Sequence, residues 1–522
     1  MASIADIRLT EAELDAAMRF VRETRYSYSL PVPFELEAVH HCWDSVRPVL
    51  ARINLLSHPP RKPLTLMAPK QRYAIRPVQL LDPLDLLLLS GLVLRIAEVI
   101  EAHRPRADRD IVHSFRIQRA ADGSLHFVSN WTRWAETVNA NVSSFPFVGR
   151  TDIADFFPQV YLHRLENSLT AVTASGGEVQ ALTRMLEGCA HGTSYGIPVG
   201  PVACNILAEA LLIEVDEYLI SSGVRFARYV DDYLIFGRSE AECLRGLHLL
   251  AERLYATQGL VLNVAKTRIQ TADAMIAALA PPADPNSALQ RKITREVFGD
   301  DKYTIVEPDR LTPEQLSLLG EVPFERILAT ALEQDLVDLN SVRFVLSVMS
   351  GMKKAVHIGV VLSNLNRLQG ASEAVARFLM HAPIDKEEER REVGKKVLEF
   401  LRGREFVPDF QAVWLLEPFV QSAAWGGVTE LRMLAREHPN RLVRRQATLA
   451  LGQAGNRSAL LDVKSRVDDV KDWELRAILF ACRALPRDER DAFWKHQGAV
   501  GGQWTIENAV AKATVEYAKN VA

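Results

Sequence analysis

Alternating apolar and polar positions in the first half of the chain predict strands as well as helices. Residues 224–236 form two apolar-rich runs on either side of Asp231 and Asp232, which predicts a β-hairpin with both acids at its turn. Another strand-like run, residues 147–151, ends at Asp152. Similar patterns predict a further hairpin turn at residues 122–123 and helices over residues 11–22, 33–56 with a bend at Pro48, 83–103, 206–221 and 239–258.

The pattern changes in the second half, where almost every segment has helical spacing. Residues 279–313 carry several prolines and predict a connection between domains. We therefore expect an α+β domain over residues 1–278 and an all-α domain over residues 314–522. In the latter, Arg445–Leu451 matches Arg476–Cys482 at an offset of 31 residues. This match predicts stacked helical repeats, with two ordinary amphipathic helices as the alternative.

Composition limits the class of protein. The 522 residues are 48% hydrophobic and 24% charged, as in a globular protein, and the net charge of −3 means that any nucleic acid must bind to local patches. The N-terminus lacks a basic segment followed by an apolar one, and the apolar run 86–94 is too short to span a membrane. Five scattered cysteines without a Cys-x-x-Cys pair favour a reducing cytoplasm and argue against structural zinc. We expect a cytoplasmic protein that does not bind membranes.

The acids at the strand ends suggest metal chemistry. Asp231 and Asp232 repel each other, and hard Mg²⁺ relieves such repulsion because it binds carboxylate oxygens. A solvated turn is the alternative for this pair alone. Asp152 supplies another carboxylate from a separate strand. Polymerases need two metal ions about 3.5–4 Å apart, which act on the attacking 3′-oxygen and on the triphosphate. Together the three acids predict a site for two Mg²⁺ ions.

Five motifs between residues 112 and 267 resemble those of reverse transcriptases. Asp152 with Phe156 and Phe157 resembles their first palm motif, and Tyr229–Asp232 resembles their YxDD box. Gly196–Pro201 resembles their substrate loop, in the form found in bacterial abortive-infection and unknown-group defence reverse transcriptases. The remaining motifs are Val112–Arg116, similar to a fingers motif, and Gly259–Thr267, similar to the motif with a conserved lysine. The resemblance covers about half of the chain.

The resemblance implies a fold and a set of metal ligands. Fingers and palm would be followed by a helical, HEAT-like domain in place of a conventional thumb. Asp152 and Asp231 would ligate both metal ions, Asp232 would assist them, and Ile153 would offer its backbone carbonyl. The departure from the general family pattern is Val199, where retroviral and intron enzymes usually carry Gln. This departure supports the defence subgroup.

Other residues acquire roles in nucleotide binding. Phe157 matches the steric gate, where an aromatic ring excludes a ribose 2′-hydroxyl, so the resemblance implies deoxynucleoside triphosphates as substrates. A core phenylalanine is the alternative. Arg76 and Arg116 are candidates for the triphosphate, because arginine binds phosphate with two hydrogen bonds. A surface charge is the alternative for Arg76. The remaining candidates are Gly196, Pro198 and Gly200, which allow a close, stiff approach of the backbone to a ligand, and Lys266, either an acid near the pyrophosphate or a lysine on a turn.

The implied activity is Mg²⁺-dependent DNA synthesis in antiphage defence. In the abortive-infection branch, synthesis needs no template, starts from a tyrosine hydroxyl of the protein and occurs in homo-oligomers. Tyr26 and Tyr28, between two predicted helices, are candidates, with packing of their rings as the alternative. A related mode copies a partner non-coding RNA, so DNA and RNA are both candidate partners. Other hypotheses are a non-enzymatic scaffold, which the intact acids argue against, and an intron-type enzyme, whose typical tail is missing.

Three smaller groups complete the candidates. Trp131 and Trp134 stand three residues apart on a predicted helix, where core packing is favoured over a stacking platform for bases. The run His40–Cys42 is not expected to bind metal, because adjacent side chains point apart. The last group is basic and suited to phosphates, with a solvated helix face as the alternative. It comprises Arg441, Arg444, Arg445 and Arg457.

Overall fold

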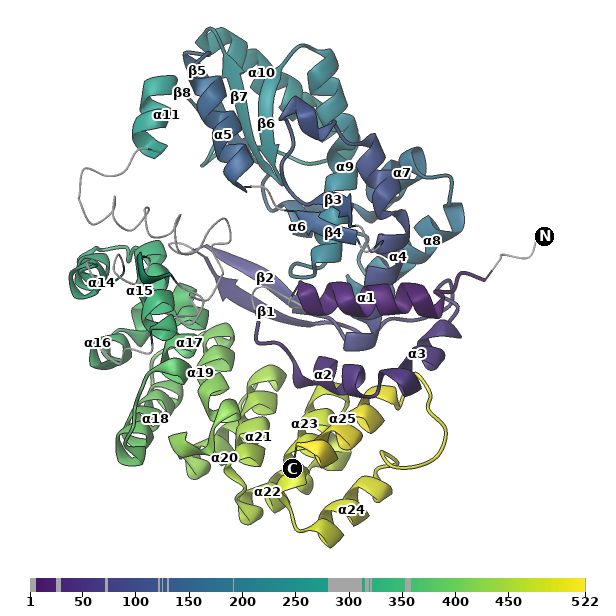
Figure 1. The fold of residues 1–522 in the computed structure, drawn as a ribbon, viewed down its shortest axis with the longest axis vertical. Helices are drawn as coiled ribbons and strands as arrows, with labels where there is room; N and C mark the ends of the chain where they lie inside the picture. The colour runs from purple at the N-terminus through teal and green to yellow at the C-terminus, as the bar shows by residue number, and fades with distance from the viewer. Residues whose placement is uncertain are drawn as a thin grey trace. The chain divides into compact units, whose positions relative to one another are not determined.

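The fold comes from a computed structural model (Figure 1). It describes residues 6–24, 30–70, 74–120, 123, 125–128, 131–190, 192–279, 312–314, 319, 322–352 and 358–521. Two compact units form, and each combines separate stretches of the chain. The first unit comprises Met1–Tyr28, Leu50–Pro63 and Gln79–Pro282. The second comprises Ser29–Val49, Leu64–Val78 and Ala283–Ala522.

A four-stranded antiparallel sheet forms the centre of the first unit. Its strand order is β6-β7-β5-β8. The predicted hairpin is confirmed, because β6 and β7 pair with only Val230 and Asp231 between them. A shorter hairpin, β3 with β4, confirms the other predicted turn. The strands are β3 (Arg116–Arg119), β4 (Leu125–Val128), β5 (Phe147–Asp152), β6 (Arg225–Tyr229), β7 (Asp232–Gly237) and β8 (Arg268–Thr271).

Helices cover both faces of this sheet. On one face, Val138 and Val142 of α5 and Met275 of α11 join an apolar cluster with Leu234 and Phe236 of β7. On the other face, α10 packs so closely that β5 and β7 carry glycines opposite it. The helices of the first unit are α1 (Glu11–Glu23), α4 (Pro83–His103), α5 (Trp131–Val142), α6 (Phe156–Gln159), α7 (Leu162–Val172), α8 (Gly176–Cys189), α9 (Val202–Ser221), α10 (Glu240–Arg253) and α11 (Ala272–Leu279), with a 3-10 turn at Ala107–Arg109 and a π turn at Leu254–Gln258.

The second unit is mainly helical. Its β-strands are β1 (Leu64–Pro69) and β2 (Ile75–Leu80), and β2 runs across the boundary into the first unit. Its helices are α2 (Phe34–His41), α3 (Trp43–Ala51), α14 (Phe324–Glu333), α15 (Leu339–Gly351), α16 (Ile358–Ser363), α17 (Ser372–His381), α18 (Glu387–Arg402), α19 (Asp409–Gln421), α20 (Val428–Glu437), α21 (Arg441–Ala454), α22 (Arg457–Lys464), α23 (Asp472–Ala481), α24 (Arg487–His496) and α25 (Ala509–Asn520).

These helices pack in two rows. In one row α15, α17, α19, α21, α23 and α25 each contact the next, and in the other α16, α18, α20 and α22 do so. The N-terminal helix α2 packs on α25 and so extends the first row (Figure 1). For the helix predicted over residues 33–56, the predicted bend at Pro48 is wrong. The chain breaks at Cys42, which caps α2, and Pro48 is accommodated inside α3.

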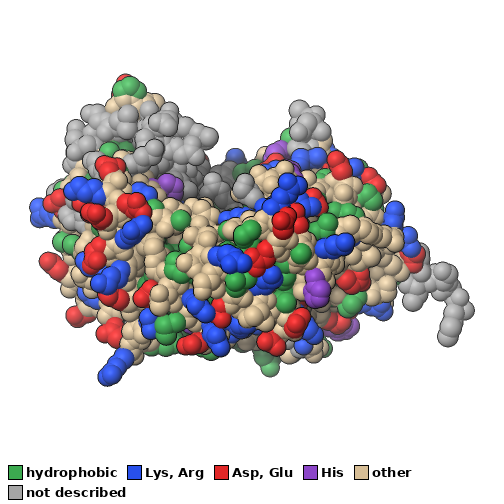
Figure 2. All heavy atoms as spheres, turned by 90° about the horizontal axis from the view of Figure 1, so that it is seen from below, with side chains coloured by type: hydrophobic (Ala, Val, Ile, Leu, Met, Phe, Trp, Pro, Cys, Tyr) green, Lys and Arg blue, Asp and Glu red, His purple; other side chains and the backbone are tan. Residues whose placement is uncertain are grey.

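The basic group on α21 and α22 is engaged within the protein. Arg441 and Arg444 both pair with Glu474, and Arg457 pairs with Glu489. Arg445 is buried against Glu35. The face of the molecule drawn in Figure 2 shows basic and acidic side chains interspersed. Among the described residues, no helix is both long and apolar enough to cross a membrane.

Candidate active site

The three candidate carboxylates meet at one end of the sheet. Asp152 is the last residue of β5 and pairs directly with Asp232, the first residue of β7. The backbone N–H of Ile153 donates to the carbonyl of Asp231 at 3.2 Å, so the turn is tied to the chain that leaves β5. The structure therefore brings Asp152, Asp231 and Asp232 together, although they come from segments about 80 residues apart in the sequence.

Negative charge accumulates at this end of the sheet. Burial, together with the charges of Asp232 and Asp152, raises the pKa of Asp231 to about 6, against the lowering effect of Lys266. Lys266 forms an ion pair with Oδ2 of Asp152. Burial acts to lower the pKa of Lys266, but its hydrogen bond to Asp152 and the neighbouring acids raise it overall. The lysine thus stays charged and neutralises part of the site.

The donor set fits a divalent cation. Asp152 is only 4% exposed, and its Oδ1 has no hydrogen-bond partner among the described residues. A buried carboxylate oxygen without a partner is costly, and a cation would satisfy it. The carboxylates of Asp152 and Asp231 and the carbonyl of Ile153 are oxygen ligands of the kind that Mg²⁺ prefers. In the part of the chain that the structure describes, no group of three or more His, Cys, Asp or Glu side chains lies in an arrangement that could hold a metal ion, so the fit rests on the chemistry of these donors.

The loop 196–200 lies beside the first acidic segment. Gly196 N–H donates to the carbonyl of Val160 at 2.8 Å, and Ile197 N–H donates to the carbonyl of Phe157 at 3.0 Å. Gly196 has φ 94°, and a Cβ there would lie 3.4 Å from the carbonyl of Pro158. The backbone conformation therefore favours glycine, whereas the space around it would admit a Cβ at ordinary contact distance. Val199 and Gln79 exchange hydrogen bonds of 3.1 and 3.3 Å, which fix the far side of the loop.

The two adjacent phenylalanines occupy different environments. Phe156 is 2% exposed and belongs to the core. Phe157 is half-buried, and its ring centroid lies 5.5 Å from that of Phe156 in an edge-to-face arrangement. Asp155 is exposed at the N-cap position of α6, where its side chain caps nothing. Of this segment, Phe157 is the aromatic side chain left accessible beside the loop and Asp152.

Lys266 reaches the carboxylates because its segment is attached to β5. Asn263 N–H donates to the carbonyl of Asp152 at 2.9 Å. The hydroxyls of Thr267 and Thr151 are 2.7 Å apart. Both contacts fix the turn that carries Lys266 next to the end of β5. The turn and the end of the sheet that carries the candidate carboxylates are therefore joined to each other.

The other predicted residues are less directly connected. Arg116 is 7% exposed, lies 3.0 Å from Glu101 Oε1 and donates to the carbonyl of Pro105 at 2.9 Å, while its Nη1 has no partner among the described residues. Arg76 lies in the second unit, so its role stays a prediction. Trp134 packs edge-on against Tyr229 with ring centroids 6.2 Å apart and borders the apolar cluster, as core packing requires. Tyr26, Tyr28 and the side chain of Trp131 lie outside the described residues.

Comparison with known proteins identifies the segment that holds this site. Residues 74–320 match the family model described as reverse transcriptase (RNA-dependent DNA polymerase). This segment is a reverse transcriptase domain. The chain is accordingly a nucleotidyltransferase of the RNA-directed DNA polymerase class, with nucleotides and nucleic acid as its substrates. Reverse transcriptases use divalent metal ions, in agreement with the donor set around Asp152.

Two similar solved structures are telomerases. One is telomerase from Candida albicans in complex with the TWJ fragment of telomeric RNA, at 12% identity and TM-score 0.33, covering 71% of this chain and 69% of that chain. The other is apo telomerase from Candida tropicalis, at 12% identity and TM-score 0.31, covering 68% of each chain. A comparison with curated proteins finds no match.

Sequence reasoning missed a buried charged network behind the reverse transcriptase site. It joins Arg104 and Ser114 to Glu209 and Asp216 of α9 and to Arg228 of β6. A signal was present in the sequence, because Glu209 and Asp216 lie among the apolar residues that α9 buries. Acids on a buried helix need buried cations as partners.

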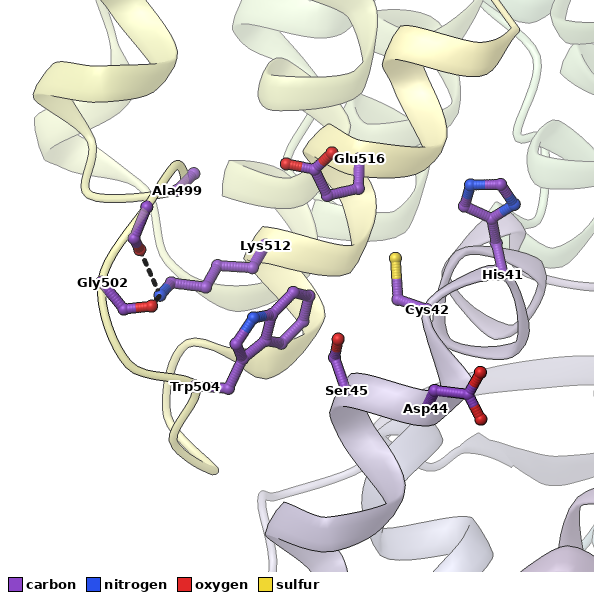
Figure 3. A pocket seen from close by; sticks show the side chains of 10 residues that line it. His41, Cys42, Asp44, Ser45, Ala499, Gly502, Trp504, Lys512 and Glu516 are labelled. Carbon is purple, nitrogen blue, oxygen red and sulfur yellow. Dashed lines mark hydrogen bonds between the residues drawn. The ribbon is translucent and has the colours of Figure 1, made fainter.

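A separate cavity of about 460 Å³ lies within the second unit (Figure 3). His41 and Cys42 line one side, and Trp504 and Lys512 line the other. The ammonium of Lys512 donates to the carbonyls of Gly501, Gly502 and Gln503, so its three donors are used within the protein. Burial raises the pKa of Cys42 to about 11, so its thiol is unreactive at neutral pH. None of the sequence-predicted site residues lines this cavity.

Proposed function

We propose that the chain is a Mg²⁺-dependent DNA polymerase that acts in the cytoplasm in antiphage defence of the abortive-infection type. The observation that carries this proposal is the meeting of Asp152, Asp231 and Asp232, with one buried oxygen of Asp152 left without a partner among the described residues. The Ile-Pro-Val-Gly-Pro form of the loop at residues 197–201 supports the defence subgroup. All five cysteines are free, which supports a reducing compartment.

The geometry supports the following proposed roles. Asp152 and Asp231 hold two Mg²⁺ ions together with the carbonyl of Ile153, and Asp232 balances charge beside them. Bound Mg²⁺ supplies activation of the attacking 3′-oxygen and charge stabilisation at the triphosphate. Lys266 lies where it balances charge among the acids and, once released from Asp152, where it is able to donate a proton to the departing pyrophosphate.

The nucleotide site proposed here lies between Phe157 and the loop 196–200. The half-buried ring of Phe157 closes the space beside the sugar, so deoxynucleotides are selected. Gly196, Pro198 and Gly200 give the backbone close access to the nucleotide. Arg76 and Arg116 are proposed to bind the triphosphate. Only the unpartnered Nη1 of Arg116 supports its assignment, because the rest of that guanidinium is engaged with Glu101 and Pro105.

The second unit is proposed to replace a conventional thumb with a HEAT-like array over residues 314–522. The two rows of helices support this proposal, as does the offset of 31 residues between α21 and α23. At the crossing of these helices, a Cβ on Gly452 would lie 2.7 Å from the Cβ of Ala481, so the small residues permit close packing. Such arrays bind partners along extended surfaces, and we propose that this one supports DNA binding and homo-oligomer formation.

Synthesis is proposed to be template-independent and primed from a tyrosine hydroxyl, with Tyr26 and Tyr28 as candidates. The purified protein, stripped of nucleotide, should incorporate labelled deoxynucleotides in Mg²⁺ and carry DNA that survives denaturation but not protease treatment. Asp231→Asn is the inactive control. Co-purifying RNA whose sequence is copied into the product would replace the template-independent mode with the RNA-copying one. Absence of incorporation with any nucleic acid offered would favour a scaffold.

A further inference from the structure

The turn that carries Asp231 has an unusual backbone. Val230 has φ 57°, in the left-handed region. Residues branched at Cβ rarely adopt this conformation, because the side chain crowds the backbone. It persists only where the surroundings hold it in place. The conformation of Val230 determines the direction in which the next residue, Asp231, leaves the turn.

Two buried side chains hold the backbone of Val230 on opposite sides. Its N–H donates to Oγ of Ser114 at 2.9 Å, and its carbonyl accepts from Nη1 of Arg228 at 2.9 Å. Ser114 and Arg228 are both 0% exposed. In a hairpin, β-ladder hydrogen bonds end at the turn, so these two contacts replace backbone partners that the turn itself cannot supply.

Each of these side chains is fixed in turn by an acid of α9. Ser114 Oγ donates to Glu209 Oε1 at 2.5 Å, which leaves its lone pairs to accept from Val230. Arg228 binds Asp216 through Nε at 2.9 Å and through Nη2 at 2.5 Å, and Nη2 lies 2.9 Å from Glu209 Oε2. Arg104 binds the same oxygen of Glu209 at 2.8 Å.

Opposite charges alternate through the network, and Nε of Arg104 is its one buried nitrogen without a hydrogen-bond partner among the described residues. Burial alone would raise the pKa of Glu209, but the charges of Arg228 and Arg104 lower it below its usual value, so Glu209 is ionised. Two arginines thus face two acids in a buried environment, where charge-assisted hydrogen bonds are strong. Burial raises the pKa of Asp216 against the lowering effect of Arg228. The acids stand on α9, a helix whose first turn directly follows Pro201 of the substrate loop.

Backbone pairing brings Ser114 to the hairpin. Arg228 N–H donates to the carbonyl of Ile111 at 2.7 Å, and His113 N–H donates to the carbonyl of Arg228 at 3.2 Å. Val112 therefore forms a parallel bridge with Arg228 of β6. The segment that resembles a fingers motif therefore contacts β6, beside the hairpin that carries Asp231, through an isolated β-bridge.

We propose that Ser114 and Arg228 are positioning residues, which hold the peptide of Val230 in its left-handed conformation and thereby direct Asp231 toward Asp152. Glu209 and Asp216 orient them from α9. The link to metal binding rests on the proposed function, whereas the link to the turn conformation does not. A network that merely stabilised the domain would affect unfolding but would leave the turn intact in the folded protein.

The test compares Ser114→Ala with Ser90→Ala in the full-length, metal-free protein. Ser90 on α4 is 1% exposed, and its Oγ has no partner among the described residues, so the control removes a buried hydroxyl that holds nothing. Amide hydrogen exchange of a peptide covering residues 226–234 is the first readout. Ser114→Ala should speed this exchange by about tenfold, because a buried N–H loses its acceptor. Ser90→Ala should leave it unchanged.

Three further readouts separate positioning from general stability. Ser114→Ala should weaken binding of Mg²⁺ alone, measured by calorimetry, and lower kcat while leaving the KM for deoxynucleotides nearly unchanged. If Ser114→Ala does not fold, Arg228→Lys replaces it in the test. Lysine keeps the positive charge but lacks the branched guanidinium, so the same losses of Mg²⁺ binding and kcat are expected. In a Val230→Gly background the effect of Ser114→Ala on exchange should shrink, because glycine adopts this conformation unaided.

The proposal fails if hairpin exchange in Ser114→Ala and Arg228→Lys matches wild type while only the melting temperature falls. It also fails if Val230→Gly leaves the effect of Ser114→Ala undiminished. If the wild-type protein binds no Mg²⁺ but hairpin exchange responds as described, the positioning inference stands and the proposed metal site falls.

Discussion

Lys266 forms an ion pair with one carboxylate oxygen of Asp152, while the other oxygen has no partner among the described residues. The two oxygens of this carboxylate thus differ, because one pairs with the ammonium of Lys266 and the other remains available to a cation. A divalent cation that binds both oxygens has to compete with Lys266. Lys266 therefore lowers the affinity of the site for a cation. In the metal-free protein, its charge also reduces the repulsion among the carboxylates.

Removal of this lysine should separate metal affinity from catalysis. Lys266→Ala should lower the half-saturating Mg²⁺ concentration by roughly two- to fivefold, the range for a partly exposed ion pair. The rate at saturating Mg²⁺ should fall, because the proton donor is lost. Calorimetric titration with Mg²⁺ and steady-state incorporation measure the two effects. A Mg²⁺ requirement that rises in this variant would contradict the competition.

Asp231→Asn should abolish nucleotide incorporation while the protein stays folded. The amide lacks the charge that a two-metal site needs, so a loss of at least about 10³-fold is expected for a mechanism that depends on metal. Asp155→Asn is the matched control, because Asp155 is exposed and caps nothing. Labelled-nucleotide incorporation and circular dichroism provide the readouts. Incorporation near the wild-type rate would remove Asp231 from the site.

Because the pKa of Asp231 is raised, we expect the free energy of unfolding to change with pH when a chelator keeps the protein free of metal. An acid whose pKa is about 6 in the folded protein, above its usual value, binds its proton more tightly when folded. Its contribution to stability is therefore present below about pH 4 and is lost as pH rises through 6. We expect a loss of roughly 1–2 kcal/mol in the free energy of unfolding between pH 5 and 7, after allowance for solvent screening. Urea unfolding should show this loss in wild type and not in Asp231→Asn.

Phe157→Ala should admit ribonucleotides. Loss of a half-buried ring beside the substrate loop opens space at the sugar, so the ratio of deoxy- to ribonucleotide incorporation should fall by about tenfold or more. Phe156→Ala is an informative contrast, because that ring is 2% exposed and its loss should cost about 3–5 kcal/mol of stability. If Phe157→Ala lowers the stability of the protein but leaves the ratio of deoxy- to ribonucleotide incorporation unchanged, Phe157 is a core residue.

The contact between Glu35 and Arg445 predicts that the N-terminal segment stabilises the C-terminal helices. Arg445 Nη2 lies 2.5 Å from Glu35 Oε2, and both side chains are buried. Glu35→Ala leaves a buried, unpaired arginine and should cost about 3–5 kcal/mol of unfolding free energy. Glu387→Ala removes an exposed partner of Arg391 at 2.5 Å and should cost less than about 0.5 kcal/mol. Equal effects in urea unfolding would contradict the buried pairing.

Local patterns in the sequence were sufficient for the centre of the site. The hairpin around Asp231 has strands with clear alternation and a two-residue turn, so its geometry follows from neighbouring residues. That Asp152 would join it required only that two strands ending in acids share a sheet. By contrast, no proline or glycine at Cys42 predicts the break between α2 and α3. Pro48 predicted a bend that the structure does not have, because the residue fits inside α3.

Contacts between distant residues were out of reach. Arg228 looked like one polar residue in a strand, yet it is wholly buried because Asp216 and Glu209 come from another element. Likewise Glu35 and Arg445 are 410 residues apart, and the sequence around each residue does not predict that the two form an ion pair. Such partners depend on tertiary packing, which periodicity along the chain does not encode. The acidic partners of the four basic residues of α21 and α22 were out of reach for the same reason, since those acids lie on other helices.

The packing of α2 on α25 has a consequence for the order of folding. Cys42 and Ala513 are in contact across 471 residues of sequence. At a synthesis rate of about 5–20 residues per second, α2 leaves the ribosome roughly 25–95 s before its partner exists. Throughout that interval the buried side of α2 has to remain uncovered or be shielded by something else. The second unit therefore closes only after both ends of the chain have been made, and its assembly is a late, non-local step.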